Sequence, residues 1–508
     1  PDLLQNEVGN RWYNWFNEGP EGQYKVFMEF AEDLSANSAR IPFADIAKST
    51  WNYMGDTAEA FNNPGNFTAF IGYEWTSTPQ GNNLHRVVVF RDGADKATRV
   101  VPFSSFDSAD PEDLWKYLAD YETKTGGRAM AIPHNANLSN GLMYDTKRLN
   151  GKRLTEEYAR TRIRFEPLHE MTQMKGDSET HPKLSPDDEF ADFERMDTSN
   201  LTGEAAMTDE MFPGSYARSA LKRGFELEKT LGVNPYKQGF VGSTDSHTSL
   251  ATAGESNYFG KASMVEPGPE RWEHVLIQSQ VDDSLTSYAA DTSASGLAAV
   301  WAVDNTREAI FDAMERRETY ATTGPRIGIR VFGGWDFDAD DVYRNDFAAF
   351  GYANGVPMGA DLSAAPRGSS PKFVVRTLRD PDGANLDRVQ MVKGWMDKAG
   401  NIFEKVYDIA LSDGRKVGQD GKAPAVGNTV DVANASFTNT IGDAVLFAHW
   451  TDPDFDAEEH AFYYVRVIEI PTPRWTAFDA KVFGVNMPDD MPMELQERAY
   501  TSPIWYTP

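Results

Sequence analysis

The chain has only imidazole and carboxylate side chains with which to bind a transition metal strongly. It contains 8 His and 77 Asp and Glu residues but no Cys. Without cysteine it can form no disulfide, thiolate nucleophile, cysteine-ligated zinc site or iron–sulfur cluster. A transition-metal site must therefore be built from His, Asp and Glu. The histidines are the scarcest of these residues, so they indicate where such a site could lie.

An Asp-x-His motif follows one apolar run. Asp245 and His247 come shortly after the run at 239–242, which predicts a strand. Alternate residues of an extended chain point to the same side, so the two side chains can reach one ion or an adjacent pair of ions. The motif alone is a weak signal because it is common by chance. Its place after a strand favours a metal site.

Three further candidate ligands flank other predicted strands. His134 follows the run at 129–133, where a proline ends the strand and directs the next side chain into the loop. Glu74 ends another run and His85 begins the next, with ten residues between them. If these residues form a loop between antiparallel strands, Glu74 and His85 lie at the same end of the sheet. His134 alone is more typical of an ordinary loop histidine, but several strand ends with His and carboxylate groups together favour a metal site.

The segment 166–182 is dense in groups that could act on a substrate. Lys175 could neutralise an anionic group, and Glu179 and His181 could transfer a proton. A polar surface loop with one solvated ion pair is an equally good interpretation of this segment. Both interpretations stay open.

Acidic residues in the C-terminal third raise the question of calcium. Two sequences begin like an EF-hand loop, namely Asp336, Asp338 and Asp340, and Asp452, Asp454 and Asp456. Both lack the glycine and the bidentate glutamate that the loop requires, so EF-hands are excluded. An irregular calcium site in the C-terminal domain stays open.

Motifs of P-loop proteins, α/β-hydrolases and zinc proteases of the HExxH type are absent from the sequence.

The apolar runs predict two regions. Up to residue 325, short apolar runs alternate with helical patterns, and Asp110 and Gly232 are the expected N-cap and C-cap of two of the helices. We expect residues 1–325 to form a barrel-like α/β domain, whose ligands collect at the carboxyl ends of the strands. Strand-like runs separated by Asp-Gly and Asn-rich turns predict a β-sandwich-like domain over 326–508, with a late helix at 493–498.

Composition and charge exclude several classes of partner. The 508 residues carry a formal charge of −28 and give a pI near 4.7, whereas a nucleic-acid-binding protein needs a basic surface. The longest apolar run, 297–303, is far shorter than the ~20 residues that span a bilayer, so we expect no membrane insertion. No targeting signal is visible. High acidity without cysteine favours a periplasmic or secreted protein, with the cytoplasm as the alternative, and the oligomeric state is not indicated.

Several of these segments together resemble a known family. The segments 72–75, 132–135, 173–182 and 242–247 are similar to signature segments of the family called domain of unknown function 3604. That family is similar in turn to the PHP (polymerase and histidinol phosphatase) metallohydrolases. The resemblance implies an α/β fold with a distorted β/α barrel of the PHP type. It also implies two or three divalent ions, such as Zn, Mn or Fe, and hydrolysis of small anionic phosphoesters or related sulfate or phosphonate esters.

The resemblance also assigns roles to particular residues. It gives metal-ligand positions to five side chains, Glu74, His85, His134, Asp245 and His247. Lys175, Glu179 and His181 lie in a segment typical of the family, and we expect them to act in catalysis.

PHP proteins also have an H-x-H motif and a later Asp-His motif, both of which should precede Glu74. The first histidine here is His85, so we expect the segment with these motifs to lie outside this sequence. The chain itself then holds ligands for about one ion. The leading hypothesis is a metal-dependent hydrolase that activates a water for attack on an ester. The alternative is a non-catalytic, degenerate barrel that binds a glycan or a partner protein through its aromatic side chains.

Overall fold

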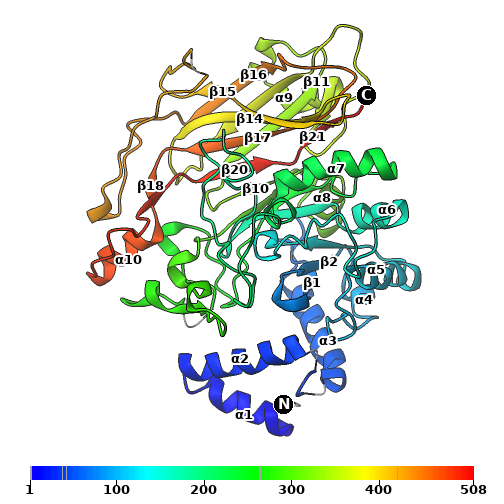
Figure 1. The fold of residues 1–508 in the computed structure, drawn as a ribbon, viewed down its shortest axis with the longest axis vertical. Coiled ribbons are helices and arrows are strands. Elements are labelled where there is room, and N and C mark those ends of the chain that lie inside the picture. Colours follow the sequence, from blue (N-terminus) through cyan, green and yellow to red (C-terminus); the bar gives the residue numbers. More distant parts are fainter. Residues whose placement is uncertain (1–2, 37, 42, 263–264, 420) are drawn as a thin grey trace.

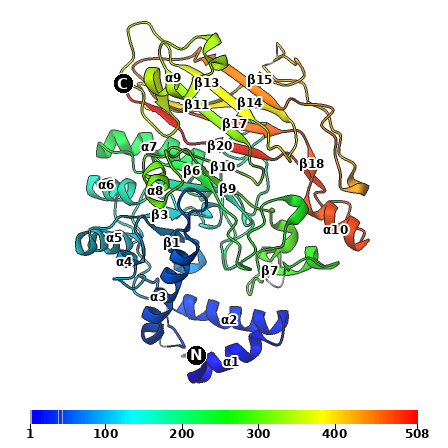
Figure 2. The same ribbon diagram turned by 180° about the vertical axis from the view of Figure 1, so that it is seen from behind.

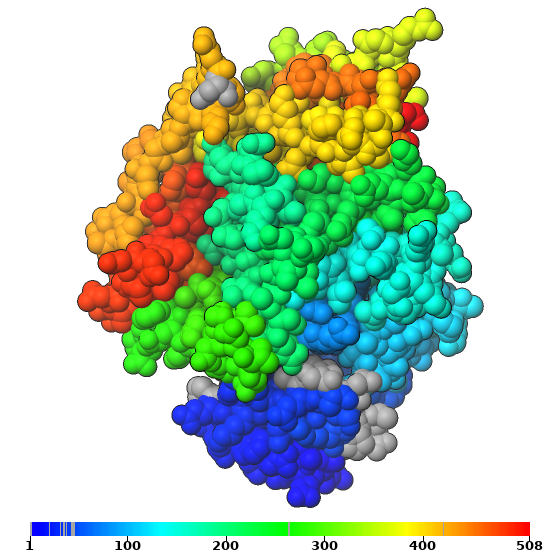
Figure 3. Space-filling model, in the orientation of Figure 1, coloured from blue at the N-terminus to red at the C-terminus, as the bar shows by residue number. Residues whose placement is uncertain are grey.

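A computed structural model describes the chain as a mixed α/β protein over residues 3–36, 38–41, 43–262, 265–419 and 421–508. Helices α1 (Glu7–Phe16) and α2 (Pro20–Ala36) lie at one end of the molecule, and a β-rich region lies at the opposite end (Figure 1, Figure 2). The α/β region with the candidate ligands lies between them. In the space-filling view of Figure 3, α1 and α2 form a blue layer at the lower end.

The other helices are distributed over the α/β and β-rich regions. They are α3 (Phe43–Phe61), α4 (Ala94–Ala97), α5 (Pro111–Thr125), α6 (Glu156–Phe165), α7 (Ala217–Leu231), α8 (Arg307–Glu315), α9 (Phe347–Asn354) and α10 (Trp475–Phe483). The two predicted caps are confirmed. Asp110 accepts a hydrogen bond from the N–H of Glu112 at 3.0 Å, and Gly232 ends α7 with a left-handed φ of 75°. No helix among the described residues is long and apolar enough to cross a bilayer.

Two small sheets and a hairpin make up the strands of the α/β region. They are β1 (Ile71–Trp75), β2 (Arg86–Phe90), β3 (Ala129–Pro133), β4 (Leu168–Gln173), β5 (Gly176–Asp177), β6 (Gly239–Gly242), β7 (Val275–Ile277) and β8 (Ser287–Tyr288). One sheet has the antiparallel order β1-β2-β3 and the other has the order β5-β4-β6, in which β4 and β6 are parallel. β3 lies beside β4, so the two sheets are neighbours.

The barrel expected for the first region is not closed in the residues that the structure describes. Its sheets are open, and β1 is an edge strand. A β/α barrel needs parallel strands, which require a long crossover between them. Here the connection from β1 to β2 contains only the short turn at Pro79–Gly81, so β2 returns antiparallel. The alternation of apolar runs and helical patterns predicted strands and helices in this region. It did not predict whether the strands close into a barrel.

The β-rich region contains two further large sheets and a two-stranded one. Its strands are β9 (Leu297–Val300), β10 (Thr319–Thr322), β11 (Gly328–Gly334), β12 (Gly355–Pro357), β13 (Lys372–Leu378), β14 (Leu386–Met396), β15 (Ile402–Leu411), β16 (Val445–Thr451), β17 (His460–Glu469), β18 (Thr472–Pro473), β19 (Glu494–Leu495), β20 (Arg498–Thr501) and β21 (Ile504–Tyr506). One large sheet has the order β15-β14-β17-β20-β10-β9, with β21 also paired to β17, and the other large sheet has the order β12-β11-β13-β16.

The two large sheets share a hydrophobic core, as in a sandwich. Val331 and Val375 come from the smaller sheet, and Val389 and Val465 from the larger one. Strands β9 and β10 precede residue 326, so the larger sheet joins strands from both sides of the predicted domain boundary. The boundary itself stays a prediction.

The helix predicted at 493–498 is wrong. Its residues lie mainly in and around the strands β19 and β20. β20 pairs with both β17 and β10, which are distant in sequence, and this pairing outweighs the local helical pattern. The helices α9 and α10 were not predicted.

A fully buried ion network joins the α/β region to the larger sheet. Arg466 on β17 donates hydrogen bonds to Glu179 at 3.0 Å and to Asp188 at 2.6 Å. Arg218 on α7 forms ion pairs with the same two carboxylates, and the Tyr464 hydroxyl donates to Glu179. Burial alone would raise the pKa of Glu179, but the two arginines hold it below its ordinary value. The network is therefore an ionised contact between distant segments.

Replacing Arg466 by methionine should strongly destabilise the protein, because Glu179 and Asp188 would each keep a buried charge with one partner fewer. Breaking a buried ion pair in this way costs about 3–5 kcal/mol. We expect Arg466→Met to unfold at a lower urea concentration than the wild type when followed by circular dichroism. Lys116→Met is the control, since Lys116 and Asp120 form an exposed pair at 3.4 Å that contributes little. Equal midpoints for the two variants would contradict this role of the network.

Candidate metal centre

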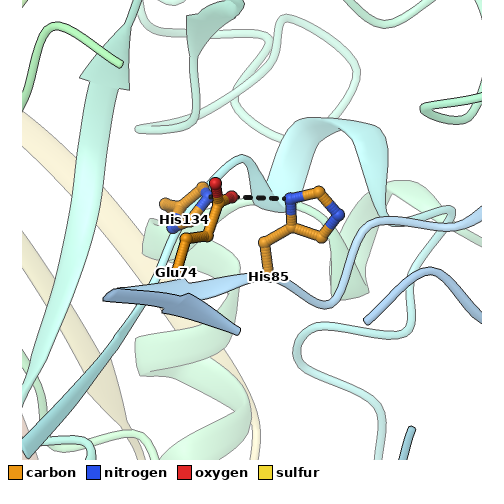
Figure 4. Close-up of side chains that lie close together, drawn as sticks. All are labelled: Glu74, His85 and His134. Atoms are coloured by element: carbon orange, nitrogen blue, oxygen red, sulfur yellow. Dashed lines mark hydrogen bonds and ion pairs between the residues drawn. The ribbon is translucent and has the colours of Figure 1, made fainter. Parts of the chain in front are cut away.

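Glu74, His85 and His134 meet at one edge of the sheet β1-β2-β3. Glu74 lies near the end of β1, His85 directly precedes β2, and His134 directly follows β3. Because β2 is antiparallel to both neighbours, its start lies beside the ends of β1 and β3. The structure thus brings together these predicted ligands, and the expected antiparallel loop between Glu74 and His85 is confirmed. Figure 4 shows the Glu74 carboxylate between the two imidazole rings.

The distances within this group suit a shared ion. Oε1 of Glu74 lies 2.9 Å from Nδ1 of His85 and 3.0 Å from Nε2 of His134. One ligand atom from each residue lies within 4.8 Å of the other two. Zinc binds such atoms at about 2.0–2.2 Å, so small movements would allow all three to bind one ion. In the described part of the chain, no other three His or carboxylate side chains converge this closely.

In this group, hydrogen bonds keep the Glu74 carboxylate ionised and orient the ring of His85. Burial alone would raise the pKa of Glu74, but its contacts with His134 and His85 lower it well below its ordinary value. Glu74 is therefore a carboxylate. The second ring nitrogen of His85, Nε2, lies 3.0 Å from the Thr78 hydroxyl, a contact of the kind that orients metal-binding histidines. Nδ1 of His134 is buried and has no hydrogen-bond partner among the described residues.

Asp245 lies beside this group but is bound by lysines. Its Oδ2 atom is 2.7 Å from Nζ of Lys175 and also contacts Nζ of Lys261. The Gln173 amide donates to the same oxygen at 2.9 Å. Burial would raise the pKa of Asp245, but the two ammonium groups lower it, so the carboxylate is ionised. Burial lowers the pKa of Lys261 to about 8, despite the opposing charge of Asp245.

The parallel pairing of β4 and β6 explains how these groups meet. Gln173 ends β4, and Asp245 follows β6, so both leave the same edge of their sheet. Gln173 also donates to the Asn135 side chain at 2.5 Å, next to His134. The charge of Asp245 in turn helps to raise the pKa of His134. The trio Glu74, His85 and His134 and the lysine-bound Asp245 therefore form one continuous site.

Two residues of the site have left-handed backbones. Asn135 has a φ of 50° and Asp245 a φ of 54°. Such a conformation costs energy outside glycine, although Asn and Asp tolerate it best. Strained backbone of this kind is concentrated at functional sites.

His247 lies at the margin of the site. Its Nδ1 atom is 2.8 Å from the main-chain oxygen of Asp245 and 3.1 Å from Nζ of Lys261, and its side chain is 51% exposed. Asp245 and His247 lie close together, with Oδ1 and Nδ1 3.7 Å apart, but the backbone at Asp245 is left-handed and not extended as expected. Both are in contact with an ammonium group.

The other residues predicted for catalysis lie in different surroundings. Lys175 belongs to the site, whereas Glu179 belongs to the buried arginine network. His181 lies 3.1 Å from a carboxylate oxygen of Asp197 and packs on Phe212. In the described contacts, neither Glu179 nor His181 touches the trio. The proton transfer assigned to these two residues stays a prediction.

Two residues of the site were missed by sequence reasoning. Glu170 on β4 is buried, and burial raises its pKa to about 7 against the influence of His134 and Ser243. A carboxylate within an apolar strand is the signal that could have identified it. Lys261 lies in a loop without a strand or helix pattern, and no sequence signal indicates its position.

Three of the six aspartates considered for calcium are paired with lysines. Ion pairs join Asp452 to Lys393 at 2.6 Å, Asp454 to Lys405 at 2.9 Å, and Asp456 to Lys398 at 3.3 Å. A calcium site in this region stays a prediction.

Comparison with known proteins gives one family. The model of the family described as Protein of unknown function (DUF3604) matches residues 1–508. No curated protein and no solved structure matches the chain. The protein belongs to the DUF3604 family.

Proposed function

We propose that the protein is a metal-dependent hydrolase of small anionic esters, related to the PHP metallohydrolases. The observation that supports this most is the convergence of Glu74, His85 and His134, with ligand atoms within 4.8 Å of one another. A PHP-type arrangement of the α/β region, a phosphoester or related sulfate or phosphonate ester as substrate, and a periplasmic or secreted location belong to the same proposal.

The donor set fits a divalent transition metal. Two imidazole nitrogens and a carboxylate oxygen suit Zn, Mn or Fe. Glu74 is ionised, and the Thr78 hydroxyl supports the ring of His85. A bound ion would supply Lewis-acid activation of a water and of the ester group.

The chain's own residues would bind and orient the substrate anion. Lys175 is buried within the site, and its charge acts on both Glu74 and His85. A buried ammonium group interacts strongly with an anion because little water screens it. Lys175 would therefore hold the negative group of an ester beside the trio, and Gln173 and Asn135 would keep the strand ends in register.

The first test is metal binding. We expect the metal-free protein to bind zinc, and His85→Ala and His134→Ala to lose most of that affinity, because each removes a ligand. Thr78→Val should weaken binding by about 10–100-fold, the usual effect of losing a residue that orients a ligand. Isothermal titration calorimetry measures all three. His460→Ala is the matched control, since His460 also lies near a carboxylate, at 3.7 Å from Glu228.

Unchanged zinc affinity in both His85→Ala and His134→Ala would show that the ion binds elsewhere. A wild-type protein that binds no zinc, manganese or iron would contradict the proposed function.

The second test is turnover of esters by the metal-loaded protein. Aryl phosphate monoesters, diesters and triesters and aryl sulfates cover the proposed class. We expect Lys175→Met to lower kcat/KM by about 10²–10³-fold for anionic esters, the effect of removing one preorganised charge-stabilising group. A neutral phosphotriester should be affected less because it carries no charge for Lys175 to bind.

A protein that binds metal but turns over none of these esters would contradict the hydrolase. Specific retention on a polysaccharide column would then support the glycan-binding alternative.

A further inference from the structure

The ammonium group of Lys261 lies against the Asp-x-His segment. Nζ contacts Oδ2 of Asp245, lies 2.9 Å from the main-chain oxygen of Asp245, and lies 3.1 Å from Nδ1 of His247. The side chain of Lys261 is only 10% exposed. The two oxygens of Asp245 accept from the ammonium group, whereas Nδ1 of His247 donates to the main-chain oxygen of Asp245 at 2.8 Å and therefore carries a proton.

Oδ2 of Asp245 is an atom that a second metal ion at the Asp-x-His segment could use. Asp245 and His247 are the two residues that the sequence suggests for such an ion. Oδ2 of Asp245 already accepts hydrogen bonds or ion pairs from Lys261, Lys175 and Gln173. A carboxylate oxygen offers about two lone-pair positions, so this atom is saturated.

A metal ion here would either bind Oδ1 of Asp245 beside the ammonium groups of Lys175 and Lys261, or take Oδ2 by displacing Lys261. The described polar contacts of the Lys261 ammonium group all go to Asp245 and His247. Displacement would leave the buried ammonium group of Lys261 without these partners. It would also leave this positive charge beside a divalent ion. Both changes cost energy. The trio differs in this respect, because the groups that contact Glu74 are two imidazole rings, which can themselves bind metal.

We propose that Lys261 takes the place of a second metal ion, so that the protein binds one divalent ion, at Glu74, His85 and His134. This inference rests on the proposed function. It adds that the second positive charge of the site is part of the chain and lies beside Asp245. Lys261 is a positioning residue that holds Asp245 beside Lys175.

The experiment counts zinc ions bound per chain. The metal-free chain of 508 residues is loaded with zinc, dialysed and analysed for metal by mass spectrometry. We expect one zinc per wild-type chain and none in His134→Ala. Lys261→Ala should bind a second zinc, because Asp245 is released, and the double variant Lys175→Met/Lys261→Ala should bind it more tightly. Lys261→Arg, which retains the positive charge, should bind one.

Lys393→Ala is the matched control. Lys393 is also a buried lysine paired with a carboxylate, Asp452, at 2.6 Å, but it lies in the β-rich region. We expect it to bind one zinc, as the wild type does.

The outcomes separate this inference from the proposed function. Two zinc ions in the wild type would overturn the inference and leave the hydrolase proposal intact. A single zinc in both Lys261→Ala and the double variant would also overturn it. No zinc in the wild type would overturn the proposed function itself.

Discussion

A charged side chain removed from water needs an opposite charge or hydrogen-bond donors, because the desolvation of an isolated ion costs several kcal/mol. This protein buries many such groups. Arg218 and Arg466 hold Glu179 and Asp188 between the α/β region and the larger sheet. The same constraint acts in the candidate site, where Lys175 and Lys261 compensate the buried charge of Asp245.

Glu74 and Asp245 are neighbouring carboxylates that differ in their ability to bind metal, because their partners differ. Glu74 is held by two imidazole rings, which can share a metal ion with it. Asp245 is held by Lys175 and Lys261, which cannot bind metal while they carry a proton. Under the proposed function, a site with one position for a metal ion and one position occupied by ammonium groups would suit an anionic ester better than a neutral substrate. The buried lysines provide positive charge whether or not an ion is bound.

Much of the metal trio could be predicted because it depends on local signals. A proline after an apolar run placed His134 beyond a strand, and a ten-residue loop placed Glu74 and His85 at one end of an antiparallel pair. The position of Lys261 could not be predicted, because it reaches Asp245 from a loop 16 residues further along the chain. The contacts of Glu179 also lay beyond sequence reasoning, since Arg466 is 287 residues away.

The sequence by itself determined which kinds of side chain could bind a metal ion. It also determined that most of the strands exist, and it fixed the caps of helices such as α5 and α7. These features follow from residue type and from backbone preferences that act over a few residues. Only the tertiary structure decided that the sheets stay open, that residues near 493–498 form strands, and that Asp245 binds lysines. Strand pairing and charge compensation depend on which distant segments come into contact. A linear pattern of apolar and polar residues does not encode those contacts directly.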